Sequence, residues 1–543
     1  MKNPSLCAVL ALATTTLIAT PVLGQWSSDP AANLPVIAAA GGQELPKVAS
    51  GPGNTTWISW FDNRGSGYQV YVQRLDAAGN PTFPGDGLLV SAHPQDTSLV
   101  DYDLTADAAG NAVLVFTDIR FDSNRDIYAY LISPTGEFLW GADGVALSAN
   151  SQFEADPRVV QTSDGEYVFL WSRNADPRGL YMQRLDAAGN KLLGDPANGF
   201  RVAGDGVEGP GFCEMIASDN GSVIAIWARD TRTFLSPRNL HAQKFDADGA
   251  PVWGTSPLIV MNSTVVPIAH RPRIVSDGGA GAVFAWHTSA LHSFVQRVSG
   301  EGELLFPANG VAVSTNNTDR LHLDPAIAFS PESGSTYVFW NERNAAQSQW
   351  GVYGQSISPT GLREWGEAGI EFVPVNGINK LFVRALTVGA DAMVFFLYQP
   401  STPLPGSRVL GMRVNAEGGQ VWAGSPIEVS SIVTGKGRLP VAIDAATGMA
   451  KVVWEDDRNG STDVYIQNVN ADGTLGGSVP ACPTDWNDDG QVNSGDISSF
   501  LTAWIASVQA PDLVADFNND GQTNSGDISA FLTAWINAVQ FGC

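Results

Sequence analysis

The chain has 543 residues, 30 of them basic and 55 acidic, which gives a formal net charge of −25. Its length allows two or more domains with sizeable cores. The negative charge argues against a nucleic-acid or anionic-membrane partner, since both require clustered Lys and Arg. It fits an exported protein or one that binds cations.

The N-terminal residues are predicted to be a secretory signal peptide. Lys2 supplies a positive end, and the apolar run CAVLALATTTLIATPVL is too short and too rich in Thr for a membrane span. The residues just before Gln25 suit cleavage of a signal peptide, so residues 1–24 are assigned to the signal. No later segment reaches ~18 apolar residues, so no membrane span is predicted. The mature chain is expected to be secreted, extracellular or at a cell surface.

Residues 26–480 repeat one pattern about every 56 residues. In each unit a β-rich run ends on an aromatic residue, which we call the marker aromatic, and a second run such as VYVQRLDAAGN follows. The marker aromatics are Trp60, Phe116, Trp171, Trp227, Trp286, Trp340, Phe396 and Trp454. Short alternating runs predict strands, and the DAAGN-type clusters predict tight turns. Two further short runs make four strands per unit, which predicts a mainly β fold: an eight-bladed β-propeller with four-stranded antiparallel blades.

The N-terminal residues of the repeat region are expected to close the ring. The eighth unit ends at NADGTLGGSVP and lacks its fourth strand, whereas LPVIAAAGGQELPKV near the N-terminus matches a fourth strand that leads into a first. Residues ~34–39 are therefore predicted to complete the last blade, which would remove an exposed sheet edge. A seven-bladed ring is the alternative.

An acidic residue and an arginine follow the marker aromatic in several units. The pairs are Asp62 and Arg64, Asp118 and Arg120, Glu342 and Arg343, and Asp456 and Arg458. They are either contacts for a ligand on one face of the propeller or structural ion pairs repeated with the blade. The many aromatic side chains would suit a glycan-binding surface, although packing between blades explains most of the repeated rings.

Two stretches near the C-terminus, 485–505 and 516–536, agree at 17 of 21 positions, and each opens with a twelve-residue loop rich in oxygen donors. Hard oxygen ligands at this spacing, with Gly at position 6, predict two Ca²⁺ sites. The predicted ligands are Asp485, Asn487, Asp489, Gln491, Asn493 and Asp496 in the first loop, and Asp516, Asn518, Asp520, Gln522, Asn524 and Asp527 in the second. Because residues 482–543 hold eight Asp and no Lys, Arg or Glu, metal binding should contribute folding energy.

Each loop runs into a predicted amphipathic helix. The apolar stripes are Ile497, Phe500, Leu501, Trp504, Ile505 and Val508, and Ile528, Phe531, Leu532, Trp535, Ile536 and Val539. One stripe per helix would let the two helices pack together. Cys482 and Cys543 bracket this segment, and in an oxidising compartment such a pair is expected to form a disulfide.

Two calcium loop–helix units placed 31 residues apart resemble a type I dockerin domain, of the bacterial subgroup that ends in Gly-Cys, over residues 482–543. The resemblance implies a small α-helical domain that docks onto a cohesin-like module. It places the recognition residues at loop positions 10 and 11, here Ser494, Gly495, Ser525 and Gly526. Many members carry a basic pair on the helix, where this chain has Leu501-Thr502 and Leu532-Thr533. Another surface protein is therefore the alternative partner.

Three hypotheses of function remain. The first is a non-catalytic propeller that binds a ligand, such as a glycan, within polysaccharide catabolism and docks through its tail. The second is a glycoside hydrolase or polysaccharide lyase carrying a dockerin, which an acid pair facing the central channel would favour. The third is a structural component of a surface layer.

Overall fold

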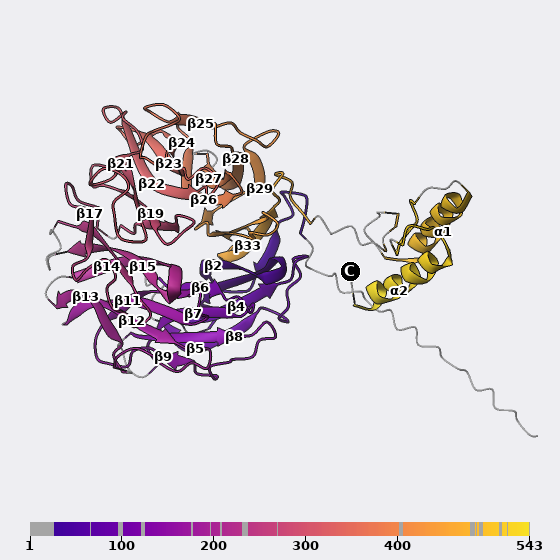
Figure 1. Ribbon diagram of the computed structural model, residues 1–543, viewed down its shortest axis with the longest axis horizontal. Helices are drawn as coiled ribbons and strands as arrows, with labels where there is room; N and C mark the ends of the chain where they lie inside the picture. Colours follow the sequence, from indigo (N-terminus) through magenta and orange to yellow (C-terminus); the bar gives the residue numbers. More distant parts are fainter. Residues whose placement is uncertain are drawn as a thin grey trace, which may run out of the picture. The chain divides into compact units, whose positions relative to one another are not determined.

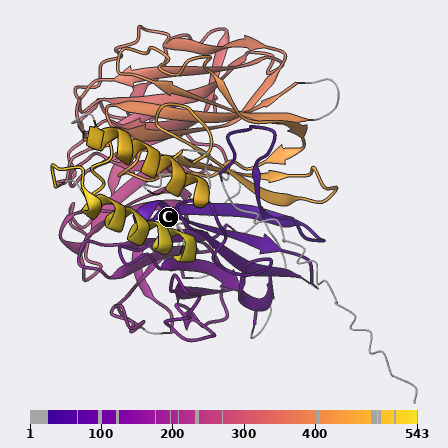
Figure 2. The same cartoon turned by 90° about the vertical axis from the view of Figure 1, so that its right-hand side faces the viewer.

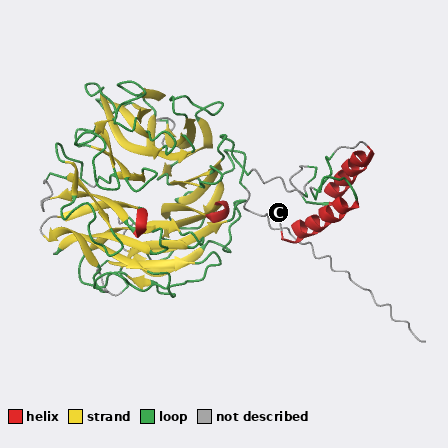
Figure 3. Cartoon of the chain, viewed as in Figure 1, coloured by secondary structure: helices red, strands yellow, loops and turns green. Residues whose placement is uncertain are grey.

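The computed structural model describes residues 26–65, 67–95, 101–120, 125–174, 177–195, 197–206, 209–230, 237–268, 270–400, 406–477, 484, 486–487, 492–509, 513–518 and 520–541. The chain divides into two compact units, Met1–Gly476 and Gly477–Cys543. Within these described residues, the regular structure of the first unit is strand apart from two short 3-10 turns, Pro52–Asn54 and Asp219–Gly221, and that of the second unit is two helices (Figure 3).

The first unit is an eight-bladed β-propeller with four-stranded antiparallel blades, as the sequence predicts (Figure 1). Blade 1 consists of β2 (Gln43–Gly51), β3 (Thr55–Asp62), β4 (Tyr68–Leu75) and β5 (Leu88–Gln95), and blade 2 of β6 (Asp103–Ala106), β7 (Ala112–Asp118), β8 (Asp126–Ile132) and β9 (Val145–Ala146). Blade 3 consists of β10 (Glu154–Gln161), β11 (Tyr167–Arg173), β12 (Arg178–Leu185) and β13 (Phe200–Gly206), and blade 4 of β14 (Gly209–Ala217), β15 (Val223–Asp230), β16 (Asn239–Phe245) and β17 (Leu258–Met261).

Blades 5 to 8 follow the same order. Blade 5 consists of β18 (Arg273–Ser276), β19 (Ala282–His287), β20 (Ser293–Val298) and β21 (Val311–Ala312), and blade 6 of β22 (Arg320–Phe329), β23 (Thr336–Asn344), β24 (Trp350–Ile357) and β25 (Ile370–Asn376). Blade 7 consists of β26 (Asn379–Val388), β27 (Asp391–Gln399), β28 (Ser407–Val414) and β29 (Ile427–Thr434). Blade 8 consists of β30 (Lys436–Gly437) with β31 (Val441–Ile443), β32 (Ala450–Asp456), β33 (Asp463–Val469) and β1 (Leu34–Ile37). Because β30 and β31 both pair with β32, they are two pieces of one interrupted strand.

The first strand of every blade lies toward the axis of the ring. Contacts join these inner strands in the order β2, β6, β10, β14, β18, β22, β26 and β31, and β31 returns to β2. In Figure 1 the labels of β2, β6 and β26 accordingly lie nearer the middle of the unit than those of the outer strands β5, β9 and β25. Side chains on the inner strands of different blades can therefore meet around the axis.

The two ends of the repeat region meet in blade 8. Strand β1 pairs antiparallel with β33, with Leu34 opposite Ile466 and Ile37 opposite Val464. Sheet hydrogen bonds between the start and the end of the repeat region close a ring without leaving a sheet edge at the seam.

Each blade is buried on both faces, which explains why its second strand is a continuous apolar run. In β7, Leu114 and Phe116 pack with residues of blade 1, whereas Val113 and Val115 pack with residues of blade 3. Successive side chains of a strand point to opposite faces, so one short run such as VLVF serves two interfaces.

A tryptophan in the loop after the third strand joins one blade to the next. Trp140 of blade 2 donates from Nε1 to the carbonyl of Ala187, in the DAAGN turn of blade 3, at 3.2 Å. Equivalent bonds run from Trp253 to Gly300, Trp365 to Ala416, Trp422 to Ala471 and Trp26 to Ala77, each at 2.9 Å. Trp26 precedes β1, so the last of these bonds joins blade 8 to blade 1.

The second unit contains helices α1 (Ser494–Gln509) and α2 (Ser525–Phe541). They lie against each other in both views (Figures 1 and 2). Phe500 and Phe531 are fully buried between them, and their rings stack with centroids 4.1 Å apart. Trp486 and Phe517 meet these rings edge-on, so each loop contributes one aromatic side chain to the small core.

Candidate functional site

The predicted calcium loops are described in part. In the second loop, all six predicted ligands, Asp516, Asn518, Asp520, Gln522, Asn524 and Asp527, belong to the described residues. In the first loop Asn487, Asn493 and Asp496 do, whereas Asp485, Asp489 and Gln491 lie outside them. Cys482 and Cys543, the predicted disulfide, also lie outside the described residues.

The aspartates at loop position 12 are the buried members of both loops. Asp496 and Asp527 are each 0 % exposed. The Asp527 carboxylate accepts backbone N–H bonds from Asn518 at 3.2 Å and Asn524 at 2.7 Å. Asp496 accepts the equivalent bonds from Asn487 at 3.3 Å and Asn493 at 2.8 Å. In each loop, position 12 therefore braces positions 3 and 9 in the same way.

The first half of the second loop folds around its own oxygen atoms. Asp516 accepts backbone N–H bonds from Asp520 at 3.1 Å and Gly521 at 2.8 Å. Asp520 accepts one from Gln522 at 2.9 Å, and Gly521 has a φ of 83°, the left-handed region that glycine adopts without strain. Within the described residues, no three His, Cys, Asp or Glu side chains form a ready-made metal cluster. The donor set of carboxylate and amide oxygens nevertheless fits Ca²⁺ in its chemistry.

The two loop–helix units support each other reciprocally. Trp504 of α1 donates from Nε1 to the carbonyl of Asn524 in the second loop at 2.8 Å. Trp535 of α2 donates to the carbonyl of Asn493 in the first loop at 3.1 Å. Each helix thus fixes position 9 of the opposite loop, and the unit has two nearly equivalent halves.

The predicted recognition residues begin the two helices. Ser494 and Ser525 open α1 and α2, and the backbone N–H groups of Gly495 and Gly526 donate to the Oδ1 atoms of Asn493 and Asn524, both at 2.7 Å. These asparagines cap the helices. The two recognition positions therefore have the same backbone setting.

The predicted apolar stripes do not pack along their whole length. Ile505 and Val508 of α1 are 53 % and 52 % exposed, and Ile536 and Val539 of α2 are 49 % and 52 % exposed. The aromatic core fills the contact between the first turns of each helix, and the last turns extend past it. Each helix consequently presents an apolar pair to solvent.

The predicted acid–arginine contacts of the propeller form ion pairs within their own blades. Arg64 lies 2.5 Å from Asp62, Arg120 2.8 Å from Asp118 and Arg458 2.6 Å from Asp456, and the three carboxylates are buried. The indole Nε1 atoms of Trp60 and Trp454 donate to Asp62 and Asp456. The fourth motif departs from this pattern, because Glu342 accepts from Trp340 while Arg343 bonds Asn341.

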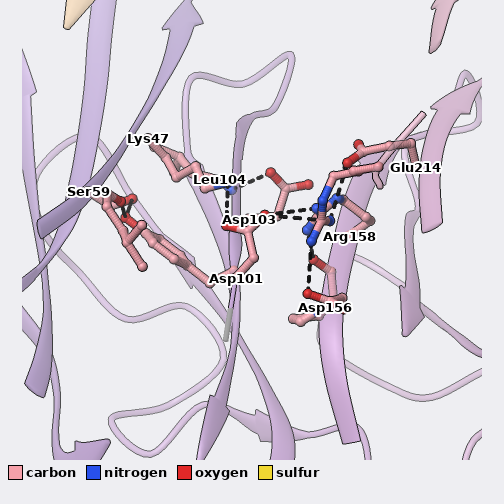
Figure 4. Close-up of polar contacts among 12 residues, drawn as sticks. Lys47, Ser59, Asp101, Asp103, Leu104, Asp156, Arg158 and Glu214 are labelled. Atoms are coloured by element: carbon pink, nitrogen blue, oxygen red, sulfur yellow. Dashed lines mark hydrogen bonds and ion pairs between the residues drawn. The ribbon is translucent and has the colours of Figure 1, made fainter. Parts of the chain in front are cut away.

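A cluster of charged side chains on and beside the inner strands meets near the ring axis (Figure 4). We call it the axial charge cluster; it consists of Lys47, Asp101, Asp156, Arg158, Glu214 and Arg271. Asp101 lies 2.8 Å from Lys47 and 2.9 Å from Arg158, and Arg158 also reaches Glu214 at 3.0 Å. Arg271 of blade 5 joins Asp156 at 2.9 Å, Glu214 at 3.3 Å and Asp101 at 3.5 Å.

The carboxyl groups of this cluster have unequal electrostatic environments. Burial raises the pKa of Glu214 against the opposing effect of Arg158. Burial also acts to raise the pKa of Asp101, but Lys47 and Arg158 outweigh it and hold that pKa below its ordinary value. The carboxyl groups of Glu214 and Asp101, which both pair with Arg158, therefore differ in pKa.

The sequence patterns used above did not identify the axial charge cluster. A signal was present: the cluster members Lys47, Arg158 and Glu214 each stand 13 residues before the marker aromatic of their blade, as do Asp103 and Arg273, and the members Asp101, Asp156 and Arg271 each stand 15 residues before it. Charged residues recurring at one place in a repeat share one place in the fold. Only the closed ring reveals that this place faces the axis, where different blades meet.

Comparison with known proteins finds a family match for the C-terminal segment. Residues 483–532 match the family model described as dockerin type I domain, which confirms the resemblance found in the sequence. No curated protein matches the chain. Within the described residues, no helix is long and apolar enough to cross a membrane.

Several solved structures are similar to this chain at a low level. The BP39L lectin from Burkholderia pseudomallei has 12 % identity and a TM-score of 0.44, over 70 % of this chain and 98 % of that one. The α-L-arabinofuranosidase of Fusarium graminearum has 10 % identity and a TM-score of 0.36, over 60 % and 96 %. The α-L-arabinanase of Penicillium chrysogenum has 13 % identity and a TM-score of 0.35, over 62 % and 97 %. Likenesses this distant carry no argument about activity or ligand.

Proposed function

We propose that this chain is a secreted, non-catalytic β-propeller binding protein whose C-terminal dockerin segment attaches it, in a calcium-dependent manner, to a cohesin-type or other surface partner. The observation that carries the proposal is the reciprocal packing of the two loop–helix units, in which Trp504 and Trp535 each bond the opposite loop. Dockerin domains generally bind calcium and dock onto cohesin modules. Two equivalent halves would offer two equivalent docking faces.

Two calcium ions are proposed, one in each loop. The second loop would hold its ion through Asp516, Asn518, Asp520, Gln522, Asn524 and Asp527, and the first loop through the corresponding Asp485, Asn487, Asp489, Gln491, Asn493 and Asp496. An ion would draw the carboxylates of Asp516 and Asp520 away from the N–H groups they accept now and offset the charge of the acidic tail. Calcium would thereby stabilise the folded second unit.

The calcium part of the proposal is tested on the full chain with and without EDTA. Removing the ions should lower the helical signal in far-UV circular dichroism and expose the C-terminal unit to protease, and added Ca²⁺ should restore both. Asp527→Ala should weaken calcium binding to the second loop. Asp472→Ala is the matched control, since it removes the same charge from an exposed turn of blade 8. An unchanged spectrum and an unchanged cleavage pattern in EDTA would refute this part.

Docking is tested with purified cohesin modules. Ser494→Asp and Ser525→Asp place a charge on one recognition face each without removing a predicted calcium ligand. If the two faces are equivalent, either variant alone should still be captured and the double variant should lose capture in the presence of Ca²⁺. Capture that survives in the double variant, or that is absent from the parent chain, contradicts docking through these residues.

For the propeller, we propose a ligand-binding role within polysaccharide catabolism, with a glycan as the ligand. The acidic side chains beside the marker aromatics are held by arginine and indole groups of their own blades, which favours the structural interpretation of those pairs. Charged side chains of different blades meet near the ring axis, so the axis is the remaining candidate for a ligand site. A panel of oligosaccharides, assayed for both binding and cleavage, tests this role; binding without cleavage is the expected result.

The axial charge cluster favours a glycoside hydrolase or polysaccharide lyase as the second candidate. Glu214, whose pKa is raised by burial, and Asp101, whose pKa is lowered, share Arg158. A pair of carboxyl groups with separated pKa values is the arrangement that general acid–base chemistry uses. Turnover of a glycan that is abolished by Glu214→Gln would establish this candidate in place of the binding protein.

A further inference from the structure

The inner strands place one residue per blade at a common register position facing the axis. We call it the axial position and define it as the inner-strand residue opposite the residue just before the marker aromatic. From blade 1 to blade 8 the axial positions are Lys47, Asp103, Arg158, Glu214, Arg273, Ala326, Arg384 and Pro440. Basic residues occupy blades 1, 3, 5 and 7, and acidic residues occupy only blades 2 and 4.

The alternation of charge therefore stops halfway around the ring. In blades 1 to 4, Lys47 and Arg158 both pair with Asp101, which stands two residues before the axial Asp103, and Arg158 also pairs with the axial Glu214. In blades 6 and 8 the axial residues are the uncharged Ala326 and Pro440, and the residue of blade 6 that corresponds to Asp101 is Asp324, which lies 3.8 Å from His287. Among the described residues, neither Arg273 nor Arg384 lies within ion-pair distance of a carboxylate.

Arg384 illustrates the electrostatic consequence. Its guanidinium donates from Nη1 to the carbonyl of the neighbouring Val383 at 2.9 Å. Burial first, and then the positive charges of Arg273 and Arg438, lower the pKa of Arg384 to about 9 against the opposing effect of Asp324. A partly buried positive charge with other positive charges nearby costs free energy unless an anion compensates it.

A pocket lies beside this half of the ring. Its volume is about 240 Å³, and its lining includes Arg271, Arg273, His270, His287 and Asp324. Burial lowers the pKa of both histidines, so they are neutral at pH 7. Asp324 is the one carboxylate in the lining; it lies at the rim, half exposed, 3.8 Å from His287. Arg273 thus lines a space large enough for a ligand group, and Arg271 beside it is already paired.

We infer that Arg273 and Arg384 bind an oxyanion group of the propeller's ligand, a carboxylate or a sulfate of an acidic glycan, in the place that acidic side chains take in blades 2 and 4. Guanidinium groups bind such oxyanions through paired N–H donors. The inference rests on the proposed ligand-binding role of the propeller and names its ligand class. The dockerin segment does not enter it.

The test measures binding to the full, calcium-loaded chain by titration calorimetry. The probes are an oligogalacturonate, a sulfated galactan oligosaccharide, a neutral galactan oligosaccharide of the same length, and free acetate and sulfate. An acidic oligosaccharide should bind, and its carboxylate and sulfate forms identify which oxyanion the site prefers. Arg384→Gln and Arg273→Gln should each reduce affinity roughly tenfold to a hundredfold, the range for losing a charge-assisted hydrogen bond.

The sharpest variant places an acid at the axial position of blade 6. Ala326→Glu should pair with Arg273 and Arg384 within the protein and remove binding of the acidic oligosaccharide. Ala326→Gln adds the same volume without the charge and should retain binding within a few-fold. If Arg384→Gln and Ala326→Glu both bind like the parent, the inference is wrong. Free acetate or sulfate that binds as tightly as the oligosaccharides would mean an adventitious ion only, which also overturns it.

The outcomes separate this inference from the proposed function. If the neutral oligosaccharide binds as well as the acidic ones and the arginine variants bind normally, the propeller keeps its binding role and only the oxyanion site is rejected. If the parent chain binds none of the oligosaccharides, the glycan-binding role fails together with the site. Docking to cohesin modules should be the same in every variant.

Discussion

At the scale of single residues, the repeated polar side chains of this protein serve two purposes. A buried glutamine in the third strand, such as Gln183, accepts from the backbone N–H of Leu193 at 2.9 Å and donates to its carbonyl at 2.8 Å, so it holds the following loop. The acid after the marker aromatic likewise accepts the indole N–H in blades 1, 6 and 8. Where that acid is replaced, in blades 3 and 5, the indole N–H groups of Trp171 and Trp286 have no partner among the described residues.

Glu342 makes the stability of the propeller depend on pH. Its side chain is buried, and burial raises its pKa to about 7 from an ordinary value of 4.5. The folded state therefore keeps a proton that the unfolded state loses, so the contribution of Glu342 to stability should fall as pH rises from about 4.5 to 7 and then level off. Glu342→Gln should remove this dependence and gain on the order of 1–3 kcal/mol relative to the parent at about pH 8.

This prediction is checked by thermal unfolding of both chains between about pH 4.5 and 8 at saturating Ca²⁺. Glu332→Gln, at an exposed position, is the control and should follow the parent at every pH. Burial lowers the pKa of His322 to about 4 from 6.5, so its contribution to stability rises with pH over this range, and it cancels in the difference because both chains carry it. A difference between Glu342→Gln and the parent that is independent of pH would contradict the prediction.

At the scale of elements, the glycine of a DAAGN turn is restricted by a neighbouring side chain as well as by the geometry of the hairpin. Gly189 has a φ of 83°, and a Cβ atom there would lie 2.8 Å from the ring of Trp140 in the preceding blade. Gly79, Gly302 and Gly473 would meet Trp26, Trp253 and Trp422 in the same way. In these four turns the glycine is thus required both by the backbone conformation and by the tryptophan that packs against it.

A pair of glycine substitutions separates the two constraints. Gly165, at the tip of the turn between β10 and β11, has a φ of 87°, and a Cβ atom there would meet nothing within 4 Å. Gly165→Ala should cost about 1 kcal/mol from backbone strain alone, whereas Gly189→Ala should cost about 2–4 kcal/mol because the tryptophan must also move. Thermal unfolding measures both, and equal costs would show that the tryptophan contact is unimportant.

At the scale of the whole molecule, the ring is held by a seam between residues that are distant in sequence. Strand β1 adds to β33, Asn33 donates to the carbonyl of Val429 at 2.9 Å, and Gln467 donates to the carbonyl of Ser27 at 2.8 Å. The ring of Trp26 packs in one buried cluster with Val464 and Ile466 of β33, whereas its bond to Ala77 stays on the N-terminal side of the seam. No chain connection joins β1 directly to β33, so the seam can open without a break in the chain.

The seam should be the weakest interface of the ring once its tryptophan is lost. Trp26→Ala is expected to increase hydrogen exchange in β1 and β33, because Trp26 packs in one buried cluster with Leu34, Val464 and Ile466 and no chain connection joins these two strands directly. Trp140→Ala removes the same contact between blades 2 and 3, where the chain itself joins the blades, and should leave exchange in β1 and β33 unchanged. Hydrogen-exchange mass spectrometry distinguishes the two variants; equal protection of β1 in both would argue against a special role for the seam.

The sequence by itself determined the eight repeats, their four strands and the paired loop–helix units, because short alternating runs, glycine turns and ligand spacing are local properties. It did not determine that Arg158 meets Asp101 and Glu214, or that Arg273 and Arg384 face the axis beyond the last acidic blade, because those neighbours stand far apart in the chain and are brought together only when the ring closes. The exposure of Ile505 and Ile536 likewise depends on how far two helices overlap, which a stripe of apolar residues does not specify.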